Sequence, residues 1–193
     1  MATEIEIKAH VKNCDKIKRL LFINAEYLGA FEKYDTYWYP EPGTYSGLPS
    51  SGLRVRKENR SFPDGIDRFS YLVTYKAKER REEIEINEEK EFEATSLRGP
   101  TAPVFEEFLA LMGLKPGNSK KKNGMAFFWD GVNAELSEVE GLGWFIELEI
   151  VSNDYKEENY DREKDRLLRI LELLGIEMEE IETRYYSEML STG

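Results

Sequence analysis

Several strand-like segments of this chain carry charged side chains on one face and apolar side chains on the other. The first, EIEIK at residues 4–8, alternates Glu4, Glu6 and Lys8 with two isoleucines. Side chains of a β-strand point alternately to opposite faces, so the three charges share one face. Taken alone, such a segment is most simply a strand of an antiparallel sheet with its charged face in solvent.

The same scheme recurs in four further segments, LRVRK, VTYKAK, EKEFEA and FIELEI, and in each of these the charges that share one face have the same sign. The charged residues are Arg54 and Arg56, Lys76 and Lys78, Glu89, Glu91 and Glu93, and Glu147 and Glu149. Like charges along and across solvent-facing strands repel, so an exposed sheet face tends to mix signs. The segregation favours charged faces that turn inward around a polar cavity.

Segments with helical periodicity supply the cover for the apolar strand faces. They are expected from Asn13 or Asp15 to Ile23, from Thr101 to Gly113, over residues 161–175, and in a short piece up to Leu190. An amphipathic helix needs an apolar surface to cover. We therefore predict an α+β fold in which a closed β-barrel has a charged lumen and helices packed outside.

The remaining pattern predicts further strands and their connections. Strands are expected at 35–40, 53–57, 69–78, 125–129, 133–139 and 144–151, with a Pro- and Gly-rich loop at 40–52 and a basic turn at 120–122. The chain has 193 residues, of which 40% are hydrophobic, and it shows no repeat or long linker. These properties suit one core, so residues 1–193 are expected to form a single domain.

Charge and cysteine content narrow the function classes. The formal net charge is −11, which argues against a general nucleic-acid or anionic-membrane surface. Cys14 is the only cysteine, so no disulfide can form within the chain, and His10 is the only histidine, which disfavours histidine-based triads and zinc sites. The sequence has no leader-like or long apolar run, and we expect a soluble, cytoplasmic protein.

A charged lumen of this composition suits a polyphosphate. The best candidates are six carboxylates and five bases, namely Glu4, Glu6, Glu91, Glu93, Glu147, Glu149, Lys8, Arg54, Arg56, Lys76 and Lys122. A triphosphate of about −4 charge with one or two divalent cations keeps this set close to balance. Mg²⁺ or Mn²⁺ suits carboxylate oxygens, and arginine and lysine hold phosphate, so phosphoryl or nucleotidyl transfer is the expected chemistry.

The same residues resemble a known family. EIEIK matches the ExExK signature of the CYTH superfamily of triphosphate tunnel enzymes, and DTYWY, LRVRK, LVTYK, NEEKEFEA, a Lys-rich run and VEGLGWFIELEI follow in family order. The resemblance covers nearly the whole chain and is closest to class IV adenylyl cyclases. It implies an antiparallel tunnel of eight strands.

The resemblance also assigns roles. It implies metal ligands at Glu4, Glu6, Glu147 and Glu149, and phosphate-binding residues at Lys8, Arg54, Arg56, Lys76 and either Lys122 or Lys120, which share a face. Glu91 and Glu93 join the expected substrate-binding set, and Lys8, Arg56 and Lys76 are the expected catalytic cations. The family commonly has an aspartate where this chain has Ser137. Serine is a poor ligand for a divalent cation, so Glu135, on the same strand face, is the candidate substitute.

Three functions fit this reading. The first is an adenylyl cyclase that converts ATP to cyclic AMP and pyrophosphate, and the second is a thiamine or inorganic triphosphatase. The third is a triphosphate- or nucleotide-binding protein without turnover, which the serine at 137 keeps open. In each case the expected partner is a small triphosphate and not nucleic acid or a membrane, and the cyclase branch implies a homodimer.

Overall fold

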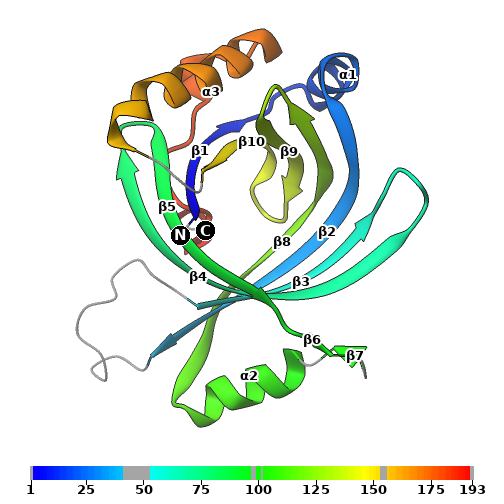
Figure 1. Ribbon diagram of the computed structural model, residues 1–193, viewed down its shortest axis with the longest axis vertical. Helices are drawn as coiled ribbons and strands as arrows, with labels where there is room; N and C mark the ends of the chain where they lie inside the picture. Colours follow the sequence, from blue (N-terminus) through cyan, green and yellow to red (C-terminus); the bar gives the residue numbers. More distant parts are fainter. Residues whose placement is uncertain (1, 41–52, 97–98, 101, 153–155, 192–193) are drawn as a thin grey trace.

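Eight antiparallel strands form a closed barrel in the computed structural model, which describes residues 2–40, 53–96, 99–100, 102–152 and 156–191 (Figure 1). Around the ring the strands are β1 (Ala2–His10), β10 (Gly143–Ser152), β9 (Val132–Val139), β8 (Leu114–Trp129), β2 (Glu26–Pro40), β3 (Leu53–Ser61), β4 (Asp67–Arg81) and β5 (Ile84–Glu93). Pairing of β5 with β1 closes the ring. The predicted closed antiparallel barrel is confirmed.

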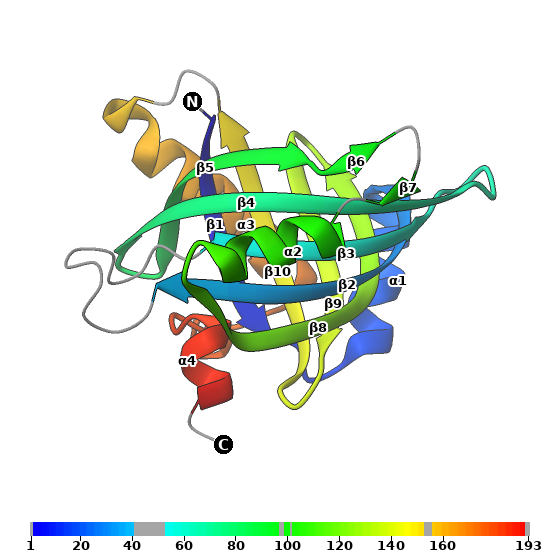
Figure 2. The same cartoon turned by 90° about the horizontal axis from the view of Figure 1, so that it is seen from below.

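The helices lie mainly outside the barrel (Figures 1 and 2). They are α1 (Cys14–Asn24), α2 (Ala102–Leu111), α3 (Tyr160–Leu174) and the short C-terminal α4 (Tyr186–Ser191), with 3₁₀ turns η1 (Glu157–Asn159) and η2 (Met178–Glu180). A small two-stranded sheet pairs β6 (Thr95–Ser96) with β7 (Gly99–Pro100). Asn13 caps α1 by accepting the backbone N–H of Lys16, and Gly175, in the left-handed region at φ 70°, ends α3.

The main apolar core lies between the barrel wall and helices α1 and α3. Ile5 and Ile7 of β1 are fully buried there, and they pack with Leu21 of α1 and with Leu167 and Leu171 of α3. A second cluster places Leu109 of α2 beside apolar residues of β2, β3 and β4. Burial of each such side chain stabilises the fold by about 1.5–3 kcal/mol. The isoleucine faces therefore point outward, and the charged faces are left to the lumen.

Two expectations about local structure were wrong. The basic run at residues 120–122 lies inside β8 and is not a turn. Alternation sends Lys120 to the lumen carboxylate of Asp35, whereas Lys121 points the other way and pairs with Glu32 at 3.4 Å, so the three lysines are accommodated in one strand. In addition, β2 begins at Glu26 and not at 35, because its first half pairs with β8 and β3. Residues 41–52 of the predicted loop lie outside the described residues.

Candidate active site in the barrel lumen

A cavity of about 530 Å³ occupies the barrel lumen. Its wall includes most of the candidate residues, namely Glu4, Glu6, Lys8, Arg54, Arg56, Glu91, Glu93, Lys120, Lys122, Glu135, Glu147 and Glu149. They come from β1, β3, β5, β8, β9 and β10, where alternation turns every second side chain inward. The side chain of Lys76 lies outside the part of the chain that the structure describes, so its role stays a prediction.

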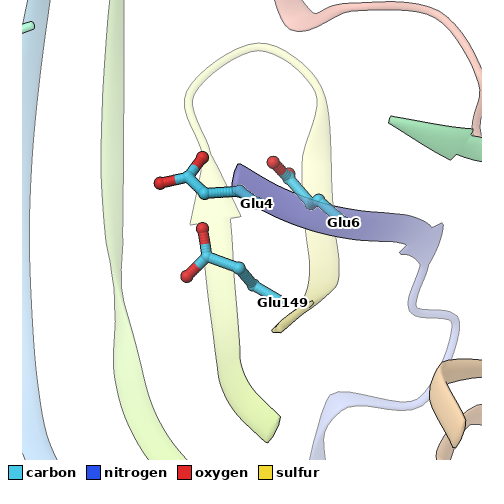
Figure 3. Close-up of side chains that lie close together, drawn as sticks. All are labelled: Glu4, Glu6 and Glu149. Carbon is cyan, nitrogen blue, oxygen red and sulfur yellow. The ribbon is translucent and has the colours of Figure 1, made fainter. Parts of the chain in front are cut away.

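Three carboxylates gather on one wall of the lumen (Figure 3). Glu4, Glu6 and Glu149 each offer an oxygen, and these oxygens all lie within 4.8 Å of one another. The pairing of β1 with β10 sets Glu6 directly opposite Glu149. Carboxylate oxygens at this spacing are the donor set that a hard divalent cation such as Mg²⁺ or Mn²⁺ prefers, so the three residues fit a metal.

The other two predicted metal ligands are bound by lysines. Lys122 Nζ donates to Glu147, and Lys33 Nζ, from β2, donates to Glu135. Burial alone would raise the pKa of Glu147, but the ammoniums of Lys122 and Lys120 hold it well below its ordinary range. Lys33 holds the pKa of Glu135 below its ordinary value in the same way. Glu147 and Glu135 are thus ionised and paired, outside the cluster of three.

A buried aspartate holds the cations on the opposite wall. Asp35 of β2 is fully buried and accepts two bonds from Arg56, from Nε at 2.7 Å and from Nη2 at 3.0 Å. Lys120 Nζ lies 3.3 Å from the same carboxylate. Burial alone would raise the pKa of Asp35, but Arg56 and Lys120 keep it well below its ordinary range. This bidentate pair fixes the guanidinium where it faces the cavity.

Arg54 belongs to a polar group near the predicted Glu91 and Glu93. Its Nη2 donates to Thr74 Oγ1 at 2.9 Å, and that hydroxyl donates to Glu91 at 2.7 Å. Glu93 accepts from Arg68 at 2.8 Å, and this pair is more exposed. Glu91 and Glu93 therefore contact arginines of the wall, and their expected part in substrate binding stays a prediction.

Sequence reasoning missed several lumen residues. Glu85 of β5 accepts a hydrogen bond from Lys8 Nζ at 2.8 Å in a buried pair. Asp35 pairs with Lys120, and Lys33 pairs with Glu135. A sequence signal was present for Glu85, which stands between Ile84 and Ile86, whereas Lys33 and Asp35 each have only one aromatic neighbour, Tyr34. Tyr186 of α4 also lines the cavity, and nothing in its helical segment pointed inward to a barrel.

Ser137 lies away from the carboxylate cluster. In β9 the residue paired with Glu149 is Asn133, whose amide donates to that carboxylate at 3.3 Å. Ser137 is four residues further on, roughly 13 Å along a strand. It is fully buried between Phe145 and Gly124, and its hydroxyl has no hydrogen-bond partner among the residues that the structure describes.

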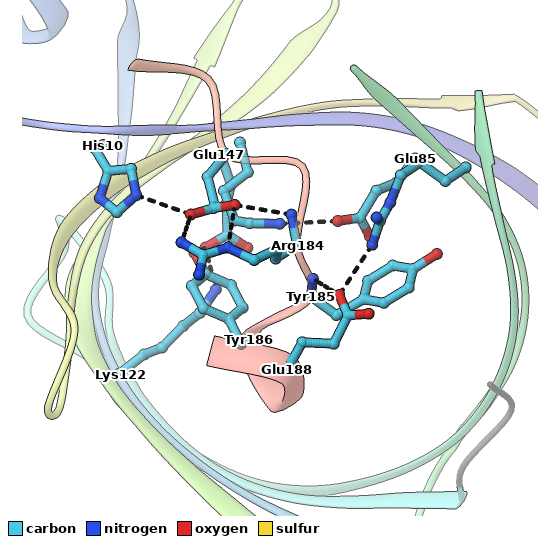
Figure 4. A network of polar contacts seen from close by, with 11 residues as sticks. His10, Glu85, Lys122, Glu147, Arg184, Tyr185, Tyr186 and Glu188 are labelled. Atoms are coloured by element: carbon cyan, nitrogen blue, oxygen red, sulfur yellow. Dashed lines mark hydrogen bonds and ion pairs between the residues drawn. The ribbon is translucent and has the colours of Figure 1, made fainter. Parts of the chain in front are cut away.

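The C-terminal segment (residues 181–191) enters this charged network (Figure 4). The hydroxyl of Tyr186 donates to Glu147 Oε1 at 2.5 Å. Burial and the neighbouring Glu147 raise the pKa of Tyr186 well above its ordinary value, so the hydroxyl keeps its proton. At the start of the segment, Glu182 accepts from Arg184 at 2.6 Å and lies 3.1 Å from His10 Nε2.

Fold and lumen together define a β-tunnel protein, with a cluster of three carboxylates on β1 and β10 and buried cations from β1, β2 and β8. The model of the CYTH domain family matches residues 2–186, and the chain belongs to that family. Among the described residues, no helix is long and apolar enough to cross a membrane.

Individual relatives agree with this assignment. The chain is 25% identical to a Methanocaldococcus jannaschii protein named "Putative adenylate cyclase MJ0240", over 96% of this chain and 97% of that one. The solved structure of the PH1819 protein from Pyrococcus horikoshii is 26% identical, with a TM-score of 0.80 over 98% of both chains. A Hippeastrum protein, described as a "Putative adenylyl cyclase" with "a dominant triphophatase activity", shares the fold at 17% identity, with a TM-score of 0.65 over 100% of this chain and 96% of that one.

Proposed function

We propose that the protein is a metal-dependent enzyme that acts on a triphosphate inside the tunnel, and that its reaction is the adenylyl cyclase reaction. The observation that carries the proposal is one cavity with two kinds of wall. Glu4, Glu6 and Glu149 lie on β1 and β10, whereas Arg56, fixed by Asp35, lies on β3. In the ring of eight strands, β3 is four strands from β10 and three from β1, so Arg56 lies across the lumen from the carboxylate cluster.

The chain's own residues would bind and orient the substrate. Arg54, Arg56 and Lys120 would hold phosphate oxygens, and the carboxylate cluster would hold Mg²⁺ or Mn²⁺, which supplies charge neutralisation for the phosphates. Tyr37 and Tyr39 also line the cavity and offer flat surfaces to a nucleobase. This last feature favours a nucleotide over a bare triphosphate.

In the proposed reaction the ribose 3′-oxygen of ATP bonds to the α-phosphorus as its proton leaves. The bond from that phosphorus to the bridging oxygen breaks, and pyrophosphate departs with the electron pair. The negative charge that develops on the leaving group would lie beside the fixed cations, which is how such a site lowers a barrier. Lys8, Arg56 and Lys76 are the residues proposed to act on this charge.

The test is product analysis of the purified protein with ATP, thiamine triphosphate or inorganic tripolyphosphate, each with Mg²⁺ or Mn²⁺. We expect cyclic AMP and pyrophosphate from ATP. Orthophosphate without cyclic AMP would establish the triphosphatase instead, since the same cradle serves both and only the phosphorus that meets the nucleophile differs. Tight binding with no product would indicate a binding protein without turnover. The absence of both binding and product would overturn the proposal.

A further inference from the structure

The C-terminal segment lies at one end of the barrel, and its Tyr186 lines the lumen cavity (Figures 2 and 4). At one end the backbone N–H of Glu182 donates to the carbonyl of Lys8 in β1 at 2.8 Å. At the other end Glu188 accepts from Arg80 of β4 at 3.0 Å. Tyr186 lies between these two attachments and is 8% exposed.

Three buried ammonium groups surround the ring of Tyr186. The Nζ atoms of Lys8, Lys120 and Lys122 lie 5.0, 4.6 and 4.8 Å from its centroid. All three distances are within the range of a cation–π contact, which is strongest where water is excluded. The lysines come from β1 and β8, so one ring collects cations from two separate strands.

Each ammonium also has a carboxylate on its other side. Lys8 pairs with Glu85 at 2.8 Å and Lys120 with Asp35 at 3.3 Å. Lys122 pairs with Glu147, which also accepts the tyrosine hydroxyl. The carboxylates bind the three ammoniums one by one, whereas the ring is shared by all three and offsets part of their mutual repulsion.

We propose that Tyr186 is a positioning residue of the phosphate cradle, whose ring holds Lys8, Lys120 and Lys122 together and whose hydroxyl holds Glu147. The inference rests on the proposed function, because it assumes that these ammoniums bind phosphate. A cradle assembled before the anion arrives binds it more tightly, since less ordering remains to be done. The ring therefore contributes to anion affinity from a position that a C-terminal helix provides.

The first experiment measures binding of inorganic tripolyphosphate by calorimetry in EDTA, where no metal-dependent turnover interferes. Tyr186→Phe keeps the ring, and we expect an affinity within about twofold of wild type, whereas Tyr186→Leu should bind at least about tenfold more weakly. Met189→Ala is the matched packing control, because Met189 lies in the same apolar cluster as Tyr186. Equal losses in Tyr186→Leu and Met189→Ala, or no loss in Tyr186→Leu, would overturn the proposal.

A second measurement needs no ligand. In protein labelled with ¹³C-lysine, the aromatic ring should shift the ε-methylene protons of a set of lysines upfield in the wild type. Tyr186→Phe should retain these shifts and Tyr186→Leu should lose them. A wild-type spectrum without shifted lysines would overturn the proposal. If the shifts behave as expected but wild type does not bind tripolyphosphate, the proposed function fails while the ring–lysine arrangement stands.

Discussion

At the residue scale, mutual proximity separates Glu4, Glu6 and Glu149 from the other lumen carboxylates. Loss of one charged ligand from such a set weakens the binding of a divalent cation, since the affinity depends on the charge and number of the ligands. We expect Glu149→Gln to weaken Mn²⁺ binding at least about tenfold, measured by electron paramagnetic resonance of free Mn²⁺. Glu138→Gln, at an exposed position of β9, is the matched control and should bind like wild type. Unchanged binding in Glu149→Gln would remove it from the metal site.

Asp35 is the residue on which the opposite wall depends. Its removal leaves Arg56 and Lys120 buried without their shared carboxylate, which is the costly way to break a buried pair. Asp35→Asn should lower the free energy of unfolding by about 3 kcal/mol in urea denaturation. Inorganic tripolyphosphate should restore part of this loss, because phosphate oxygens replace the missing charge. A variant as stable as wild type would contradict this account.

At the same scale, we expect the serine at 137 to affect packing and not metal binding. Its buried hydroxyl has no partner in the described part of the chain, so Ser137→Ala should be neutral or stabilise the fold by up to about 1 kcal/mol. Ser137→Asp buries a carboxylate against Phe145 and the Gly124 backbone and should destabilise the fold by several kcal/mol, roughly, without strengthening Mn²⁺ binding. Thermal melts and Mn²⁺ titration of both variants check this. Tighter Mn²⁺ binding by Ser137→Asp would restore a metal role for the position.

At the scale of elements, the stability of the C-terminal segment should depend on pH through Glu182, whose carboxylate contacts Arg184 of the same segment and His10 of β1. The side-chain bonds from Arg184 lower the pKa of Glu182 to about 2, below the value of about 4.3 in an unfolded chain. Folding therefore favours the carboxylate, so its contribution is complete above about pH 5 and is lost as the pH falls through about 2. Because Arg184 is exposed, solvent screens this pair and we expect only a small contribution to the free energy of unfolding.

Glu182→Gln tests this attachment by urea denaturation at several pH values. The variant should be less stable than wild type at pH 7, and the difference should vanish near pH 2. Glu179→Gln, at an exposed position of η2, is a control for the loss of one acidic charge nearby. A difference between wild type and Glu182→Gln that does not change with pH would show that the carboxylate charge is not what holds the segment.

The elements also show how far sequence reasoning reaches. Alternation along β1, β3 and β10 was enough to predict which side chains face inward, because the strand period fixes the face once the isoleucines are assigned to the outside. Pairing between distant strands was not readable, so the binding of Glu147 by Lys122 and of Asp35 by Arg56 could not be foreseen. The run at residues 120–122 was misread because three lysines suit a strand only when carboxylates from other strands neutralise them. Tyr186 was missed because its position depends on where the whole barrel places the C-terminal segment.

At the scale of the whole molecule, the tunnel gathers many charges in one low-dielectric space, where carboxylates and basic side chains form ion pairs with one another. These ion pairs can be exchanged for pairs with a ligand. A polyanion can replace the carboxylates as the partner of the basic side chains, and its metal ions can bind the carboxylates, so no charge is left buried alone. Ligand binding should therefore be measurable as a gain in protein stability, because a ligand that binds only the folded state raises the protein's free energy of unfolding.

Inorganic tripolyphosphate with Mg²⁺ should raise the melting temperature of the wild-type protein. At a free concentration 100 times its dissociation constant, the gain is about 2.7 kcal/mol, which for a domain of this size corresponds to roughly 5–10 °C. Sulfate at equal ionic strength should give a much smaller shift, because it cannot reach both walls of the tunnel. Arg56→Ala should reduce the shift for tripolyphosphate more than for orthophosphate. Equal shifts for all three anions, measured by calorimetric melts, would mean that the lumen responds to charge alone and that the two walls do not act on one extended ligand.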